Sequence, residues 1–318
     1  MWHLRLLLAL CLGMSESWAG AQDYPTKPVR LIVGVAPGGG VDTLTRSIAA
    51  RLAESFKQTV VVDNRTGAGS SIATELTARA TPDGHTLMMV TASLVIYPAM
   101  YRASYDPVRD FAPVTQVVTV PLLVVINPAV PAQTAGELIT LAKGRPGTIN
   151  YASSGSGSFI HLTGELFKVA TGTDLVHIPY KGNAAVYPDL IAGQTQLGFT
   201  AISSAMPHVK SGRLRGLAVT SRARSKGVPE FPSLAEAGVP GFDVTQWYGV
   251  VAPAGTPRPV IDRLQREIAA VLQQPEVIVR LAMEGDSVNS SSAQFGQHIR
   301  GELDKWVKVI KQTGIRGE

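Results

Sequence analysis

Cysteine is almost absent from this chain: of 318 residues only Cys11 is a cysteine, and it lies in an N-terminal apolar run. Once that run is removed, the chain has no disulfide, no thiolate metal site and no cysteine nucleophile. Charged residues are also scarce, at 17% against 45% hydrophobic residues. This balance excludes a mostly disordered protein, and the length is sufficient for two domains.

The first 22 residues, MWHLRLLLALCLGMSESWAGAQ, have the layout of a secretory signal peptide. Arg5 precedes the apolar run 6–14, and Ala19-Gly20-Ala21 forms a small-residue cleavage site. The run is far shorter than the roughly 20 residues that span a bilayer. The pattern therefore predicts export, with residues 1–21 removed near Ala21. A lipoprotein signal ending at Cys11 is the alternative, although Leu10 is bulky for one.

The charge balance is mildly basic, with 29 Lys and Arg against 24 Asp and Glu. Loss of residues 1–21 removes one arginine and one glutamate, so the net charge stays at +5. This excess suits a small anionic ligand. Nucleic-acid binding is not expected, because no basic stripe with interleaved aromatic residues is present.

Short β-like runs alternate with helical stretches along the chain, which predicts parallel sheets covered by helices on both faces. Two such blocks indicate two lobes facing a cleft at the carboxyl ends of the strands. The expected strands are 29–35, 59–63, 87–92, 122–128, 148–153, 175–180, 195–201, 214–220 and 248–253. The expected helices are 44–56, 71–80, 134–144, 159–170, 184–193, 257–274, 275–284 and 292–313.

The first loop that could carry chemistry is GVAPGGGVD, residues 34–42. It is not a triphosphate loop, because Gly40-Val41 stands where Lys and Ser or Thr are needed. It is not a dinucleotide fingerprint either, because Thr43 replaces the third glycine. What remains is a backbone that a ligand can approach closely, followed by free helix amides that suit a carboxylate. Asp42 is either the helix N-cap or an acceptor for a ligand group.

A second loop, NYASSGSGSFIH at 150–161, has the same design. Ser153, Ser156 and Ser158 supply hydroxyl groups, and Gly155 and Gly157 are expected to expose amides. The alternative is a plain turn with Ser158 as N-cap. The glycine and serine spacing does not match the nucleophile elbow of a hydrolase.

Metal and catalytic signals are weak. His161 and Glu165 stand four residues apart, a spacing that is more typical of a pair on a helix surface than of a metal site. No nucleophile with an assigned base can be identified. We therefore expect no metal, no cofactor and no enzyme activity. The alternative is a secreted enzyme that acts on a carboxylate, in which Lys181 or His161 would be the base.

Eleven motifs in the same order resemble the tripartite tricarboxylate transporter substrate-binding receptors, also called the Bug family. The resemblance runs from Tyr24 to Ile315. The motifs are YPTKPVRLIVGVAPGGGVD, VVVDNRTGAGSSIA, ATPDGHTL, YDPVRDFAPV, NYASSGSGSFIHLTGELF, VHIPYKG, DLIAGQTQLGF, GRLRGLAVTS, PSLAEAGVPGF, WYGVVAPAGTP and KWVKVIKQTGI.

The resemblance implies a two-lobed α/β periplasmic binding protein of type II, each lobe a doubly wound sheet flanked by helices. The first lobe would comprise 22–122 and the return segment 247–318, and the second lobe 123–246. Such a receptor is a non-enzymatic monomer that closes on a small carboxylate and delivers it to a membrane permease. A receptor that only signals is a further alternative.

The resemblance also implies which residues would bind the ligand, mostly through backbone amides and hydroxyl groups. In the first lobe they are Gly38, Gly39, Gly40, Val41, Asp42, Thr91, Ala92 and Ser93. In the second lobe they are Ser153, Ser154, Gly155, Ser156, Gly157, Ser158, His161, Tyr180, Lys181, Gly182, Phe199, Thr200 and Ala201, with Trp247 and Tyr248 nearby.

Two departures from the family pattern bear on the ligand. Thr200 stands where many members have Asp, which predicts a ligand without a free amine. Gly34 and Val35 replace a frequent Pro and Phe, which would widen the floor of the pocket.

Overall fold

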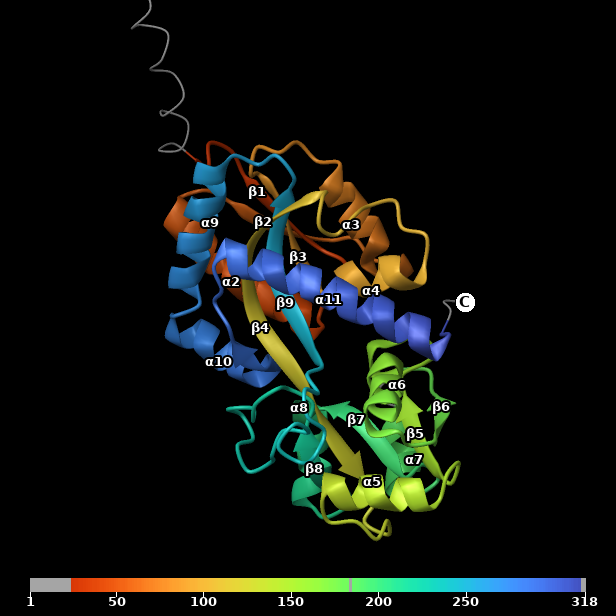
Figure 1. Cartoon of the computed structure of the whole chain (residues 1–318). Coiled ribbons are helices and arrows are strands. Elements are labelled where there is room, and N and C mark those ends of the chain that lie inside the picture. The colour runs from red at the N-terminus through yellow and green to blue at the C-terminus, as the bar shows by residue number, and fades with distance from the viewer. Residues whose placement is uncertain (1–23, 183–184, 316–318) are drawn as a thin grey trace, which may run out of the picture.

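The computed structural model describes residues 24–182 and 185–315, so the predicted signal peptide lies outside the described residues. Two α/β units lie one above the other and are joined by long strands that run between them (Figure 1). Within the described ranges, no helix combines the length and the apolar character that crossing a membrane requires.

The first sheet has the strand order β2-β1-β3-β9-β4. Strands β1, β2 and β3 are parallel, and β9 runs antiparallel to both β3 and β4. The strands are β1 (Val29–Val33), β2 (Val60–Asn64), β3 (Thr86–Thr91), β4 (Phe111–Ile126) and β9 (Thr245–Pro253), with the short β10 (Asp286–Ser287) beside β4.

The second sheet has the strand order β6-β5-β7-β4-β8, and only the last part of β4 takes part in it. Strands β5, β6 and β7 are parallel, and β4 is antiparallel to its neighbours β7 and β8. The strands are β5 (Ile149–Ser153), β6 (Leu175–Pro179), β7 (Leu197–Ala201) and β8 (Arg215–Val219).

Strand β4 belongs to both sheets. Its first part pairs with β9 as far as Pro121, and from Leu122 onward it pairs with β7. The α/β periplasmic binding-protein fold predicted from the sequence is therefore confirmed. The predicted lobe boundaries stay predictions, although β4 changes partners beside the first of them.

Helices cover both faces of each sheet. Those of the first unit are α2 (Gly40–Phe56), α3 (Ser71–Ala78), α4 (Ser93–Met100), α9 (Arg258–Val271), α10 (Pro275–Glu284) and α11 (Ser292–Thr313), with the 3-10 turn η2 (Ala68–Ser70). Those of the second unit are α5 (Ala135–Gly144), α6 (Phe159–Thr171), α7 (Val186–Ala192) and α8 (Ile202–Lys210).

The alternation of side chains along the strands explains these two layers. Leu31 and Val33 pack against α2, α9 and α10, whereas Ile32 faces the layer of α3, α4 and α11. In the second unit, Val124 belongs to the core beneath α5 and α6, and Leu123 to the core beneath α7 and α8. The largest core contains residues of both units, so one continuous apolar layer runs along β4 and β9.

Apart from the short η2 and β10, three segments were not predicted from the sequence: α4, α8 and the first half of β4. Each contains proline, which normally interrupts such elements. Pro98 lies inside α4 and Pro207 inside α8. Pro113 lies beside an irregularity in the pairing of β4 with β9, where the register shifts. Packing against neighbouring elements stabilises these segments in spite of the prolines.

Candidate functional site

A cavity of about 550 Å³ lies where the carboxyl end of β3 faces the start of α6. Elements of both units form its walls: η2, β3, α4 and β9 from the first, and the loop before α6 from the second. The size is typical of a small-molecule site. The lining residues are Ala68, Gly69, Thr91, Ser93, Ile96, Tyr97, Met100, Tyr101, Gly157, Phe159 and Gln246.

Three residues that the sequence placed at the site line this cavity: Thr91, Ser93 and Gly157. Sequence reasoning missed the wall formed by α4. Tyr97 and Tyr101 stand four residues apart, a helical spacing that was the available signal for this wall, although Pro98 lies between them. Ala92 is the N-cap of α4 and is fully buried.

Trp247 and Tyr248 do not line the cavity. Trp247 is fully buried, and its indole Nε1 donates a hydrogen bond to Glu302 Oε2 at 3.3 Å. Tyr248 is also buried, in the core beneath α2 and α9. Side chains alternate across a strand, so Gln246 points to the face opposite to Trp247, and it lines the cavity.

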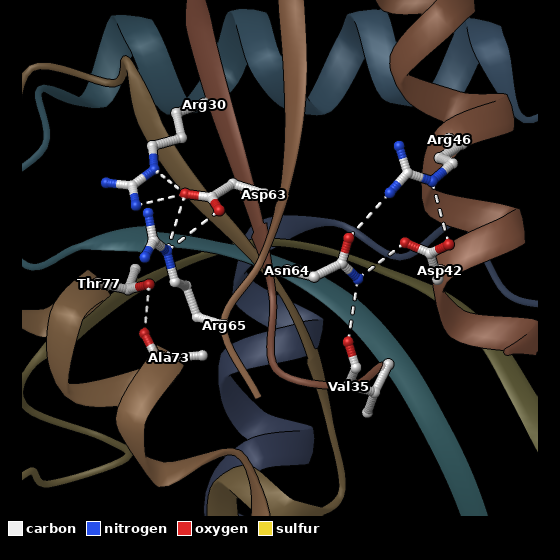
Figure 2. A network of polar contacts seen from close by, with 9 residues as sticks. All are labelled: Arg30, Val35, Asp42, Arg46, Asp63, Asn64, Arg65, Ala73 and Thr77. Atoms are coloured by element: carbon white, nitrogen blue, oxygen red, sulfur yellow. Dashed lines mark hydrogen bonds and ion pairs between the residues drawn. The ribbon is translucent and has the colours of Figure 1, made fainter. Parts of the chain in front are cut away.

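The first glycine loop is organised by Asp42 (Figure 2). Helix α2 begins at Gly40 with Gly39 as its N-cap, so Asp42 lies inside the helix and the prediction of Asp42 as N-cap is wrong. Its Oδ2 accepts hydrogen bonds from Gly38 N at 2.9 Å and Arg46 Nε at 3.0 Å. Its Oδ1 accepts one from Asn64 Nδ2 at 2.9 Å.

These contacts keep Asp42 ionised. Burial alone would raise the pKa of this carboxyl, but hydrogen bonds from Arg46, Gly38 and Asn64 outweigh that effect and lower the pKa. Asn64 Nδ2 also donates to the Val35 carbonyl at 3.0 Å and so ties the end of β2 to the loop (Figure 2). Both oxygens of Asp42 are therefore occupied in holding the loop in shape.

A second carboxylate lies beside the same loop. Glu284, near the end of α10, packs so closely against Gly40 that a Cβ at this position would overlap its carboxylate. Burial raises the pKa of Glu284. A side chain at position 40 would therefore force the Glu284 carboxylate to move, and the role of Gly40 in ligand binding stays a prediction.

The second loop satisfies its own amides, so the expectation that Gly155 and Gly157 expose them is wrong. Gly155 N donates to Ser153 Oγ at 3.1 Å, and Gly157 N donates to His161 Nδ1 at 2.9 Å. Ser158 is the N-cap of α6, because its Oγ accepts from His161 N at 3.2 Å. Ser156 at the tip of the loop is exposed. The small polar side chains next to these amides compete with any ligand for them.

Two stacked histidines, His161 and His177, contact this loop. The rings of His161 and His177 lie 3.8 Å apart and 10° from parallel, and His177 Nε2 lies 2.6 Å from Ser153 Oγ. Burial lowers the pKa of both, and the neighbouring His161 helps to lower that of His177 to about 4. Both rings are therefore neutral at neutral pH and position the loop.

Glu165, the predicted partner of His161, is held by other groups. Its Oε1 accepts a hydrogen bond from the Tyr151 hydroxyl at 2.7 Å and pairs with Lys168 at 3.0 Å. Among residues 24–182 and 185–315, no three His, Cys, Asp or Glu side chains are grouped as metal ligands.

The histidine pair predicts a loss of stability in mild acid. The unfolded chain protonates His177 near its ordinary value of about 6.5, whereas the folded chain resists protonation until pH is near 4. The free energy of unfolding should therefore fall as pH drops from about 6.5 towards 4. We expect a smaller drop for His177→Gln, measured by urea unfolding at about pH 7 and about pH 5. An equal drop in the variant would contradict this role.

The remaining predicted residues lie at the carboxyl ends of β6 and β7 and do not line the cavity. Lys181 is exposed, and Gly182 N donates to the Ser154 carbonyl at 3.3 Å. The Tyr180 hydroxyl donates to Asp189 at 2.7 Å. Phe199 is fully buried, and Ala201 is the N-cap of α8.

Thr200 is 5% exposed, and its hydroxyl donates to the Leu123 carbonyl at 3.4 Å. The neutral side chain and its internal bond place no acidic acceptor at this strand end. The preference for ligands without a free amine stays a prediction.

This fold, with a cavity between two α/β units, defines a solute-binding protein of the periplasmic type. Residues 44–315 match the model of the tripartite tricarboxylate transporter family receptor. Protein BugT of Bordetella pertussis is 36% identical over 300 residues, which are 93% of this chain and 92% of that protein.

Two solved structures agree with this assignment. A protein of R. palustris solved with adipate is 36% identical, has a TM-score of 0.75 and covers 92% of this chain and 99% of its own. The periplasmic binding protein BugD is 32% identical, with a TM-score of 0.72 and coverage of 93% and 100%. The chain therefore belongs to the tripartite tricarboxylate transporter receptor family, as the sequence motifs indicated.

Proposed function

We propose that this protein is a periplasmic receptor that captures a small carboxylate, releases it unchanged and delivers it to a permease of the tripartite tricarboxylate type. The observation that carries the proposal is the cavity with walls from both units, at the carboxyl ends of their strands. A ligand in this position contacts both units at once. It stabilises a closed arrangement to the extent that it binds that arrangement more tightly.

Polar groups on both sides support a carboxylate as the ligand. Thr91 Oγ1 and Ser93 Oγ lie 2.9 Å apart at the end of β3, so one hydroxyl hydrogen remains for a ligand oxygen. On the side of the second unit, Gly157 lines the cavity, and the neighbouring Ser156 is exposed. The adipate found with the R. palustris relative is a carboxylate as well.

A thermal-shift screen tests the proposal. We expect small carboxylates to raise the melting temperature, and phosphates and nucleotides to leave it unchanged, because the lining lacks the Lys of a phosphate site. At about 100 times the dissociation constant, a ligand should add roughly 2.7 kcal/mol to the free energy of unfolding. Stabilisation by nucleotides alone would contradict the proposal.

We further propose that the receptor reaches the periplasm as a monomer without residues 1–21. Its signal peptide has the basic, apolar and small-residue regions that processing requires. The intact mass of the exported protein should correspond to a chain beginning near Gln22. A mass that includes residues 1–21, or a lipid on Cys11, would contradict this.

A further inference from the structure

One wall of the cavity is aromatic. Tyr97 and Tyr101 of α4 stack with their ring centroids 4.9 Å apart and their planes at 29°. Tyr101 is 37% exposed, although a ring of this size usually finds a covered position. Gly69 lies against the edge of the Tyr97 ring, where a Cβ would stand 3.2 Å from Cδ2. The glycine leaves the stacked pair open to the cavity.

Two further lining residues, Phe159 and Met100, are apolar. Phe159 packs edge-on against the buried ring of Trp306, with 5.7 Å between centroids. Met100 extends from α4 towards the second unit, where its Cε would lie 2.8 Å from a Cβ at Gly157. Thioether and ring edges of this kind make favourable contacts with an aromatic ligand.

The cavity offers no charge to a second carboxylate. None of its described lining residues is Lys, Arg, His, Asp or Glu. A carboxylate at Thr91 and Ser93 finds a hydroxyl donor, but a second one would lie against the rings without a cation. An unpaired charge in such surroundings is costly to bury.

One lining group has an unsatisfied hydrogen-bonding atom. Gln246 Oε1 is buried and, in the described structure, has no hydrogen-bond partner. Buried amide oxygens are usually bonded, so this carboxamide is available to turn towards a ligand. It can donate through Nε2 to a carboxylate oxygen without adding charge.

We propose that the ligand of this receptor is an aromatic monocarboxylate, with its ring against Tyr97, Tyr101 and Phe159 and its carboxylate at the polar end of the cavity. This inference rests on the proposed function, because it specifies the carboxylate that the same cavity binds. The rings supply dispersion and stacking, and the hydroxyl groups with Gln246 supply the polar contacts.

Calorimetry with benzoate, phenylacetate, succinate, adipate and the neutral benzamide tests the proposal. The aromatic acids should bind at least about tenfold more tightly than the two dicarboxylates, because only the latter bring an unpaired second charge. Benzamide should bind more weakly than benzoate, because it lacks the charge that strengthens the polar contacts.

Two variants, each with a matched control, locate the binding. Tyr97→Leu should weaken benzoate binding about fivefold, because leucine fills space but does not stack. Tyr187→Leu on α7, outside the cavity lining, should leave binding unchanged. Gln246→Glu should weaken binding at least about tenfold through repulsion of the carboxylate, whereas Gln273→Glu adds the same charge at an exposed position in the turn between α9 and α10 and should have little effect.

The outcomes distinguish this inference from the function on which it rests. Tighter binding of succinate or adipate, or an unchanged benzoate affinity in Tyr97→Leu, would overturn the aromatic ligand and leave a carboxylate receptor. Failure of all four acids to bind, together with no carboxylate hit in the thermal screen, would overturn the proposed function itself.

Discussion

Replacing Glu302 by alanine should lower the free energy of unfolding by about 3 kcal/mol, because two buried indole groups lose their acceptor. Glu302 is 8% exposed on α11, and its Oε2 accepts hydrogen bonds from Trp247 Nε1 at 3.3 Å and Trp306 Nε1 at 3.1 Å. Trp247 lies on β9, so this carboxylate joins α11 to a strand that pairs with β4. Lys305 forms an ion pair with its other oxygen.

Thermal or urea unfolding measures this effect, and the melting temperature should fall by roughly 6 °C or more. Glu302→Gln retains an acceptor oxygen and should lose less than half as much. Asp304→Ala, an exposed position on the same helix, is the matched control and should change stability by less than about 0.5 kcal/mol. The tryptophan emission of Glu302→Ala should also shift. A loss no larger than that of the Asp304 control would show that the indoles do not depend on this acceptor.

Gly157→Ala should weaken carboxylate binding at least about tenfold, which corresponds to about 1.4 kcal/mol. Gly157 has a φ of +73°, a conformation that an L side chain rarely adopts. A Cβ there would also lie 2.8 Å from Met100 Cε, so the methionine would have to move within the cavity wall. Both the loop and the wall would change at the site.

Gly172→Ala separates backbone strain from the effect on the site. Gly172 ends α6 with a φ of +63°, and a Cβ there would meet nothing within 4 Å. Both variants should lose roughly 1–2 kcal/mol of stability from the left-handed backbone. Only Gly157→Ala should also lose affinity for the carboxylate that stabilises the wild type most in the thermal screen. Equal affinities in the two variants would contradict the place of Gly157 in the site.

The positions of the strands and helices could be predicted from the sequence wherever local patterns are unambiguous. The strand and helix periods in 29–91 and 258–313 match the observed elements closely, because these segments have apolar faces of regular spacing. The family motifs also place the two predicted ligand loops at the carboxyl ends of the strands. The elements that contain Pro98, Pro113 and Pro207 were missed, because the packing that tolerates a proline comes from distant parts of the chain.

By itself, the sequence determined the fold class, the family and the positions of the two glycine loops, because these depend on local periodicity and on contiguous motifs. Only the tertiary structure decided which groups of those loops are available. Asn64 at the end of β2 donates a hydrogen bond to Asp42, and His161 in α6 accepts one from the Gly157 amide. These loop groups, which the sequence indicated as open to a ligand, are therefore already bonded within the protein. The partners of the Gly38, Gly155 and Gly157 amides lie within four residues of them, but only the folded geometry shows that these side chains turn back onto the amides. The aromatic cavity wall and the carboxylate shared by Trp247 and Trp306 arise in the same way, from side chains that only the fold brings together.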